Sequence, residues 1–155
     1  AALFLAGRAR EMEARWAEGA AAYARALALE PSLAAARRGR AVCLAAERRD
    51  AEALVALGNG SARGGGAAAT LLRAAWSRLC RSAGPADERL RACVLGGETE
   101  RAAVVLAAAV EGRSPFAIFV PREALLRPLS GRPAYRSLLE LVPARAGDGS
   151  WTKSR

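Results

Sequence analysis

The sequence predicts an all-α fold, and two observations support this prediction. Apolar residues make up 52% of the chain and aromatic residues only 5%, with alanine the commonest residue, so good helix formers greatly outnumber strand formers. Three segments also carry one helix-face pattern. It consists of a small residue, a bulky apolar residue four positions later, and a second small residue three positions after the bulky one. Such residues share one stripe of a helix, and the small ones let a neighbouring helix approach closely. The three sets are Gly19/Tyr23/Ala26, Ala53/Leu57/Gly60 and Ala102/Leu106/Ala109.

Proline, glycine and acidic residues divide the chain into helical segments. Pro31 ends the second segment, and Gly84-Pro85 and Gly96-Gly97 each precede a further helix. Acidic residues follow both glycine signals, where carboxylates favour the positive end of a helix dipole, and we interpret them as first-turn charges. The predicted helices cover residues 2–14, 17–29, 33–47, 50–58, 67–82, 86–95, 99–111, 122–127 and 134–142.

A repeat is indicated by the spacing of the first two sets, which lie 34 residues apart. This is a period at which helix–turn–helix units stack into solenoids. The run over 16–32 resembles the second helix of a tetratricopeptide repeat, followed by its proline and polar turn. Gly7 stands where that family keeps a glycine in the first helix, whereas Arg10 replaces an expected aromatic residue. The resemblance implies a right-handed α-solenoid of helix–turn–helix repeats.

The spacing between the second and third sets is longer, at 49 residues. The excess coincides with the glycine-rich segment 58–66, which predicts a flexible loop because glycine loses more backbone freedom on ordering than any other residue. No lysine follows the glycines, so the segment lacks the pattern of a phosphate-binding loop.

The C-terminal third carries a second resemblance. Segments 95–102, 111–116 and 125–139 are similar to the closing part of tetratricopeptide arrays in bacterial regulators, where the arrays are joined to adenylate cyclase, kinase or winged-helix modules. The resemblance implies that 113–142 caps the open end of the solenoid, so that one array spans 1–142. The sequence departs from the family pattern at Ser130, Arg132, Ala134 and Tyr135.

Two further C-terminal segments have their own patterns. The apolar run 115–121 is β-prone, so a short strand or a partner-pairing edge is the alternative to an extended packing segment. Residues 143–155 are rich in glycine and serine and show no apolar period, which predicts a disordered tail.

The chain offers no evident chemistry of its own. It has no histidine, the usual general base beside a nucleophilic serine or cysteine, and no closely spaced thiols for a metal, so we predict no catalytic residues, no cofactor and no metal. Cys43, Cys80 and Cys93 are interpreted as free, buried thiols of a reducing compartment, which gives a cytoplasmic location. No membrane span or secretion signal is apparent. Because the chain begins with alanine, we expect it to be a piece of a longer protein.

The net charge of +9 has two interpretations. Of the 24 basic residues 23 are arginines, which the composition of a GC-rich coding sequence explains. Alternatively, the clusters at Arg37-Arg38-Gly39-Arg40 and Arg48-Arg49 attract an acidic or nucleic-acid partner. No aromatic residues are interleaved with them for base stacking.

The expected function is therefore that of a protein-interaction scaffold, which binds a protein or peptide within a larger signalling or transcription-regulating protein. The resemblance places the groove on the first helix of each pair, and its arginines suit an acidic, carboxylate-bearing segment. The alternative is an arginine-rich helical nucleic-acid-binding module, and an enzyme is the weakest of the three hypotheses. The sequence does not indicate whether the chain is a monomer or an oligomer. The expected groove residues are Phe4, Arg8, Glu11, Arg38 and Val42.

Overall fold

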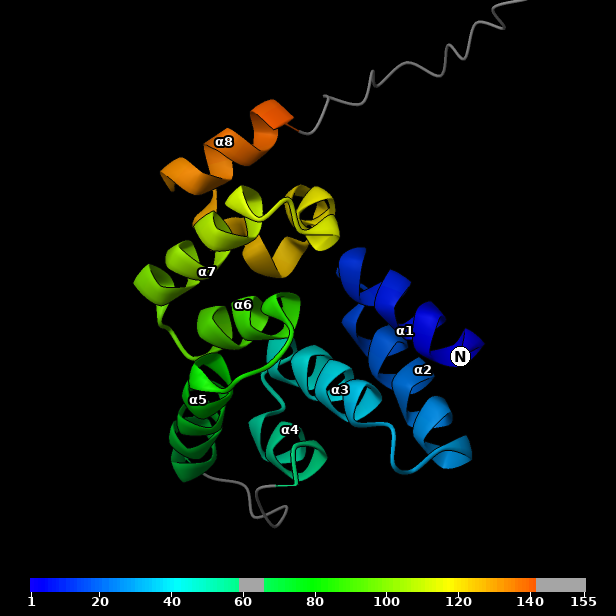
Figure 1. Cartoon of the computed structure of the whole chain (residues 1–155). Helices are drawn as coiled ribbons and strands as arrows, with labels where there is room; N and C mark the ends of the chain where they lie inside the picture. Colours follow the sequence, from blue (N-terminus) through cyan, green and yellow to red (C-terminus); the bar gives the residue numbers. More distant parts are fainter. Residues whose placement is uncertain (59–65, 142–155) are drawn as a thin grey trace, which may run out of the picture.

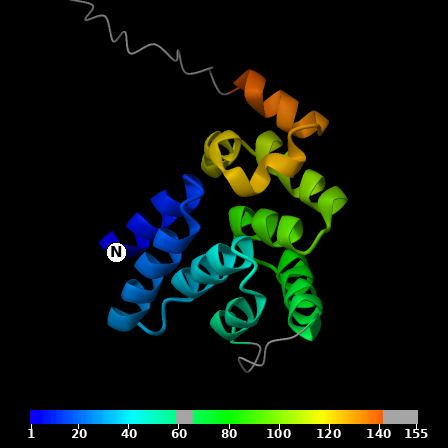
Figure 2. The same ribbon diagram turned by 180° about the vertical axis from the view of Figure 1, so that it is seen from behind.

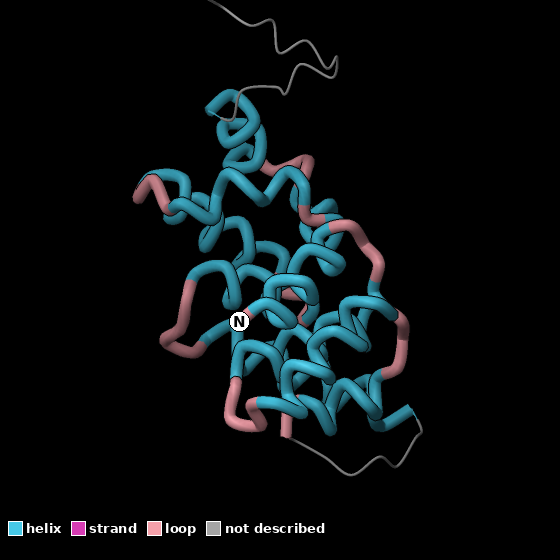
Figure 3. Tube along the Cα trace, turned by 90° about the vertical axis from the view of Figure 1, so that its right-hand side faces the viewer, coloured by secondary structure: helices cyan, strands magenta, loops and turns pink. Residues whose placement is uncertain are grey.

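A computed structural model describes residues 1–58 and 66–141 of the chain. The described residues form helices joined by short loops, with no strand among them, which confirms the all-α prediction (Figure 3). The elements are α1 Ala2–Met12, α2 Trp16–Leu29, α3 Ala34–Ala46, α4 Asp50–Ala56, α5 Gly66–Arg81, α6 Ala86–Leu95, α7 Thr99–Glu111, the 3₁₀ helices η1 Pro115–Arg122 and η2 Ala124–Leu129, and α8 Pro133–Leu141.

Three helix hairpins, α1/α2, α3/α4 and α6/α7, share one turn geometry. Each turn contains a residue with positive φ: Ala14 (59°), Arg48 (63°) and Gly97 (76°). The N–H of the next residue bonds to the carbonyl five positions earlier, at 2.9 Å for Arg15, 2.9 Å for Arg49 and 2.8 Å for Glu98. This is the Schellman arrangement that closes helix C-termini. The turns repeat at the 34- and 49-residue spacings of the sequence pattern.

An ion pair follows each turn at the same position. In the first two hairpins an arginine bonds the glutamate three residues later through two nitrogens, Arg15 to Glu18 at 2.8 and 2.6 Å and Arg49 to Glu52 at 2.8 and 2.7 Å. The third hairpin has the charges reversed, because Glu98 precedes Arg101, and the closest N–O distance is 3.1 Å.

The longer second spacing has a structural explanation in helix α5. This helix lies between the second and third hairpins and packs against α4 and α6. The glycine-rich segment accounts for only part of the excess, and its residues 59–65, including Gly60 of the second set, lie outside the described part. In Figure 1, α3 and α6 occupy the centre, with α2, α4, α5 and α7 around them.

The bulky residue of the small–bulky–small pattern is fully buried in the first and third hairpins, whereas Leu57 of the second set is partly buried. Tyr23 of α2 is 1% exposed, and glycines face its ring from two neighbouring helices. A Cβ atom on Gly39 of α3 would lie 2.4 Å from Tyr23 Cζ, and one on Gly7 of α1 would lie 2.8 Å from Cδ1. The absence of these Cβ atoms therefore makes room for the aromatic ring. In the third hairpin Leu106, which is fully buried, takes the corresponding place between Ala102 and Ala109.

The structure corrects both conformations that the sequence analysis considers for residues 115–121. Residues 115–121 form neither a strand nor an extended stretch but most of the 3₁₀ helix η1. The segments η1, η2 and α8 pack on α7, and η2 also packs on α6, so this part of the chain covers the third hairpin. Seen from behind, η1 and η2 also lie next to α1 (Figure 2). The predicted tail, 143–155, lies outside the described residues.

Candidate functional site

A cavity of about 290 Å³ opens between α1, α3 and α6 and the loop that joins α5 to α6. Its volume is at the lower end of the range for ligand pockets. Aromatic and aliphatic side chains share its wall with charged ones. The lining residues are Phe4, Arg8, Glu11, Tyr23, Ala35, Arg38, Gly39, Val42, Trp76, Leu79, Ser82, Ala83, Gly84, Pro85, Asp87, Glu88, Arg89, Arg91 and Ala92.

All five residues of the expected groove line this one cavity. Phe4, Arg8 and Glu11 come from α1, and Arg38 and Val42 come from α3. Their convergence follows from the repeat, because Arg38 and Val42 stand 34 residues after Phe4 and Arg8 and therefore occupy the same positions on the next first helix.

The third hairpin contributes the same two positions, which the sequence analysis missed. Asp87 and Arg91 stand 49 residues after Arg38 and Val42, and both line the cavity. Asp87 is one of the acidic residues after Gly84-Pro85 that the sequence analysis interprets only as first-turn charges. The signal was present in the sequence, since the 49-residue spacing between the second and third sets applies to the first helices as well.

A buried network of charges forms one wall. Glu11 is 3% exposed and accepts hydrogen bonds from Tyr23 Oη at 2.7 Å and from Arg8 Nη1 at 2.8 Å. Glu123, between η1 and η2, is 4% exposed and accepts from Arg8 Nη2 and from Arg91 Nε, the latter at 3.1 Å. The network thus joins α1 to α6 and to the C-terminal segment, between residues 115 positions apart.

The electrostatics of this network follow from burial. Desolvation raises the pKa of Glu11 above its ordinary value of 4.5, against the lowering effect of Arg91, Arg8 and the Tyr23 hydroxyl. Burial and the neighbouring Glu11 also raise the pKa of Tyr23. Tyr23 therefore keeps its proton and remains the hydrogen-bond donor to Glu11.

Two buried N–H groups of the wall have no acceptor among the described residues. The Arg38 guanidinium pairs with Glu88 at 2.8 Å through Nη2, but its Nε is buried and makes no hydrogen bond. Trp76 of α5 is 3% exposed, and its indole Nε1 likewise has no partner. Such groups are rare in folded proteins, because a buried donor without an acceptor costs about 1–3 kcal/mol.

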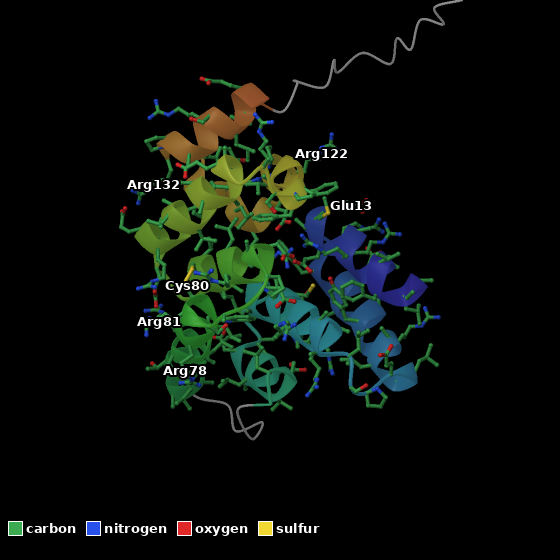
Figure 4. The ribbon with its side chains drawn as sticks, viewed as in Figure 1. Glu13, Arg78, Cys80, Arg81, Arg122 and Arg132 are labelled. Carbon is green, nitrogen blue, oxygen red and sulfur yellow. A yellow bond between two sulfur atoms is a disulfide. The ribbon has the colours of Figure 1, made fainter. Side chains whose placement is uncertain are left out.

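The cysteines differ from the sequence expectation. Cys80 of α5 and Cys93 of α6 form a disulfide with a Cα–Cα distance of 4.8 Å, and the bond lies in the part of Figure 4 where Cys80 and Arg81 are labelled. The interpretation of all three cysteines as free thiols is wrong for this pair, because two neighbouring helices bring them into bonding geometry without a local motif. The inference of a reducing compartment rested on free thiols and no longer follows.

Cys43 is the one free cysteine in the described part of the chain, and it is buried. Burial, with Glu11 and Glu47 nearby, raises the pKa of Cys43 to about 12, so the thiol is protonated at neutral pH. It packs as a small apolar residue beside Gly19, where a Cβ atom would lie 2.9 Å from its sulfur. Residues 1–58 and 66–141 contain no group of three or more side chains suited to a metal ion.

A comparison with protein-family models finds no family that matches the chain, and comparisons with curated proteins and with solved structures find no match either. The resemblance to tetratricopeptide regulators therefore stays a prediction. No single helix of the described residues is long and apolar enough to cross a membrane. One bent pair, Thr99–Glu111 with Pro115–Arg122, meets the length and composition requirements together.

Proposed function

We propose that this protein is a tetratricopeptide-type scaffold, a right-handed solenoid whose capped array binds a peptide segment of a partner protein in the cavity between α1, α3 and α6. One observation carries the proposal. The same two helix positions, repeated in three hairpins, line a single cavity: Phe4, Arg38 and Asp87 at the first, and Arg8, Val42 and Arg91 at the second. Repeat arrays bind partners through such aligned positions on their inner helices.

The character of the wall also favours binding over catalysis. The buried carboxylates of the network, Glu11 and Glu123, are engaged by arginines, so neither is set up as a general base in the wall. Aromatic and aliphatic residues, together with a few polar groups, are the usual lining of a recognition site. The scaffold would serve a larger signalling or transcription-regulating protein, as arrays of this kind do.

Selection from a phage-displayed library of linear peptides, followed by fluorescence anisotropy with the selected peptides, tests the proposal. Ala35 lines the cavity on α3, so Ala35→Phe fills the space and should weaken binding by at least about tenfold, or 1.4 kcal/mol. Its neighbour Ala34 is exposed and does not line the cavity, so Ala34→Phe is the matched control. Equal affinities for the two variants would refute the cavity as the binding site.

The alternative, an arginine-rich nucleic-acid-binding module, has weaker support. Two arginines of these clusters are already engaged by carboxylates, because Arg38 lines the cavity and pairs with Glu88, and Arg49 pairs with Glu47 and Glu52. Its test is the salt dependence of binding to duplex DNA and single-stranded RNA, with a log–log slope of about −0.9 per duplex phosphate neutralised. A steep slope that Ala35→Phe leaves unchanged would favour this alternative.

A further inference from the structure

We propose that the exposed face of α5 is a second binding surface, which binds an acidic helix of a partner protein. This surface, the α5 face, consists of six exposed residues: Thr70, Leu71, Arg73, Ala74, Arg78 and Arg81. It is separate from the cavity, because the residues of α5 that line the cavity, Trp76 and Leu79, lie on the opposite side of the helix. The inference therefore goes beyond the function proposed for the cavity and does not depend on it.

The α5 face has no negative charge of its own. Residues 53–86 form the longest stretch of the sequence without an aspartate or a glutamate, and α5 lies entirely within it. Arg73 and Arg78 form no ion pair with the described part of the chain. Arg81 pairs with Glu98 in the turn between α6 and α7, yet 56% of its side chain remains exposed. Figure 4 shows Arg78 and Arg81 at the outer edge of the helix, where a partner can reach them.

The helices that pack against α5 do not neutralise this charge. These helices are α4 and α6, and three of their carboxylates pair with other arginines: Glu52 with Arg49, Asp87 with Arg91 and Glu88 with Arg38. The fourth, Asp50 in the first turn of α4, forms no ion pair with the described residues of α5. A partner that carries carboxylates would therefore meet guanidiniums that the fold leaves unpaired, which gives electrostatic complementarity.

The distribution of side chains on the α5 face favours a helix as the partner. Thr70 and Ala74 lie in the middle of the exposed arc, with Arg73 on one flank and Arg78 on the other. Small residues in the middle let a second helix approach to an interaxial distance of about 8–10 Å. The flanking arginines then reach carboxylates on the flanks of that helix, as charged residues do beside a coiled-coil seam. Leu71, which is 57% exposed, adds an apolar contact on the side of Arg78.

Two further features support a protein partner. The Cys80–Cys93 disulfide attaches the C-terminal end of α5 to α6, so Arg78 and Arg81 stand on a fixed element and lose less freedom on binding. The α5 face is poorly suited to nucleic acid, because it has no aromatic side chain for base stacking and one of its three arginines is already paired.

The experiment measures the binding of two matched helical peptides to the full chain by fluorescence anisotropy. Both peptides carry a stripe of alanine and leucine; glutamates flank this stripe in the first peptide, and glutamines replace every glutamate in the second. We expect the glutamate peptide to bind in a saturable way and at least about tenfold more tightly than the glutamine peptide. Arg73→Gln combined with Arg78→Gln should weaken binding of the glutamate peptide about three- to tenfold, the worth of two exposed ion pairs.

Matched variants separate a specific surface from the general positive charge of the chain. Arg25→Gln with Arg136→Gln removes the same charge from exposed arginines of α2 and α8. At about 0.1 M ionic strength this pair should leave the affinity nearly unchanged, because charges more than about 10 Å away are largely screened. Ala74→Tyr places a ring in the middle of the arc and should weaken binding at least about threefold, whereas Ala108→Tyr on the exposed side of α7 should not.

The other outcomes overturn the inference. Equal binding of the two peptides, or equal losses from the two pairs of arginine variants, would refute the α5 face as an acidic-partner surface. No effect of Ala74→Tyr would refute a packed helix as the occupant. Tighter binding of a DNA duplex than of the glutamate peptide, lost in Arg73→Gln with Arg78→Gln, would assign the face to nucleic acid instead. Ala35→Phe, which fills the cavity, should not affect the glutamate peptide, and a loss of binding there would place the peptide in the cavity.

Discussion

The first and third hairpins share a turn but are held together by different means. In the first, Tyr23 fits its ring against two glycines and donates to the buried Glu11. In the third, the apolar Leu106 needs no polar partner, and the Cys80–Cys93 disulfide fixes α6 to its other neighbour, α5. Packing in the first hairpin is thus coupled to the polar wall of the cavity, whereas packing in the third depends on apolar contact and a covalent link.

The largest effect is expected from the removal of the polar centre of the first hairpin. Glu11→Ala leaves the Tyr23 hydroxyl and the Arg8 guanidinium with fewer partners in a buried site. We expect the free energy of unfolding to fall by about 3–5 kcal/mol in urea titrations, the usual cost of breaking a buried ion pair. A fall no larger than that of an exposed Glu→Ala control such as Glu100→Ala would contradict the role assigned to this network.

The disulfide provides the corresponding test near the third hairpin. Cys80→Ser with Cys93→Ser removes a link between residues 13 apart in sequence, and the chain-entropy model predicts a loss of about 3 kcal/mol for a loop of about this size. Urea unfolding with and without a thiol reductant measures this loss. The natural chain should respond to the reductant and the double variant should not. Three free thiols in the unreduced, denatured chain would show that the bond does not form.

The glycines around Tyr23 give a smaller effect, which can be reversed. Gly39→Ala places a Cβ atom against the ring and should cost about 1–3 kcal/mol through overpacking. In the background of Tyr23→Leu, which makes the first hairpin resemble the third, the same substitution should cost much less. The coupling in a double-mutant cycle is the measurement. Additive costs would show that the ring and the glycine do not interact.

Whether the sequence predicts a feature of these hairpins depends on how far apart in the sequence the interacting residues lie. The all-α class and the hairpins follow from periodic patterns, so they could be predicted to within a few residues at helix ends. The five expected groove residues come from the resemblance to tetratricopeptide repeats, and the structure places all five on one cavity. Asp87 and Arg91 follow from the same period but were missed, because α5 interrupts the repeat.

Contacts between distant segments leave no such pattern. Glu123 pairs with Arg8, which lies 115 residues earlier in the chain. The buried N–H groups of Trp76 and Arg38 find no acceptor among the described residues because of how the surrounding helices pack. The disulfide likewise joins two helix faces whose relative rotation the sequence does not specify. Pairings of this kind depend on how whole helices pack, which local spacing cannot determine.

The residues with positive φ in the two turns should change the free energy of unfolding by about 1 kcal/mol when they are exchanged between alanine and glycine. Ala14 and Gly97 occupy the same left-handed position in the first and third turns, and only glycine adopts it without a steric cost. Gly97→Ala should therefore lower the free energy of unfolding by about 1 kcal/mol, and Ala14→Gly should raise it slightly. Thermal unfolding of both variants measures the two changes. Changes of the same sign would mean that the turns are not equivalent.

The smallest effect is a pH dependence of opposite sign in the two hairpins. Burial raises the pKa of Glu11, whereas a hydrogen bond from Ser77 and the nearby Arg81 and Arg101 lower the pKa of Glu98. The contribution of Glu11 to stability is therefore fully present below pH 4.5, its unfolded value, and is lost as the pH rises through the folded pKa. The contribution of Glu98 is present above pH 4.5 and is lost as the pH falls through its folded pKa.

Two amide variants separate these contributions in urea titrations from pH 3 to pH 8. The difference in free energy of unfolding between the natural chain and Glu11→Gln should decline with rising pH, and the difference for Glu98→Gln should increase. The natural chain and the Glu11→Gln variant contain the same charged and titratable groups around position 11. The contributions of these groups to the pH dependence therefore cancel, to first order, from the difference between the two chains. These groups are Arg8, Tyr23, Cys43, Arg91 and Glu123. If both differences increased with pH, the effect of the arginines on the pKa of Glu11 would outweigh the effect of its burial. The first hairpin would then be stabilised by ionised pairs, as Glu98 stabilises the third.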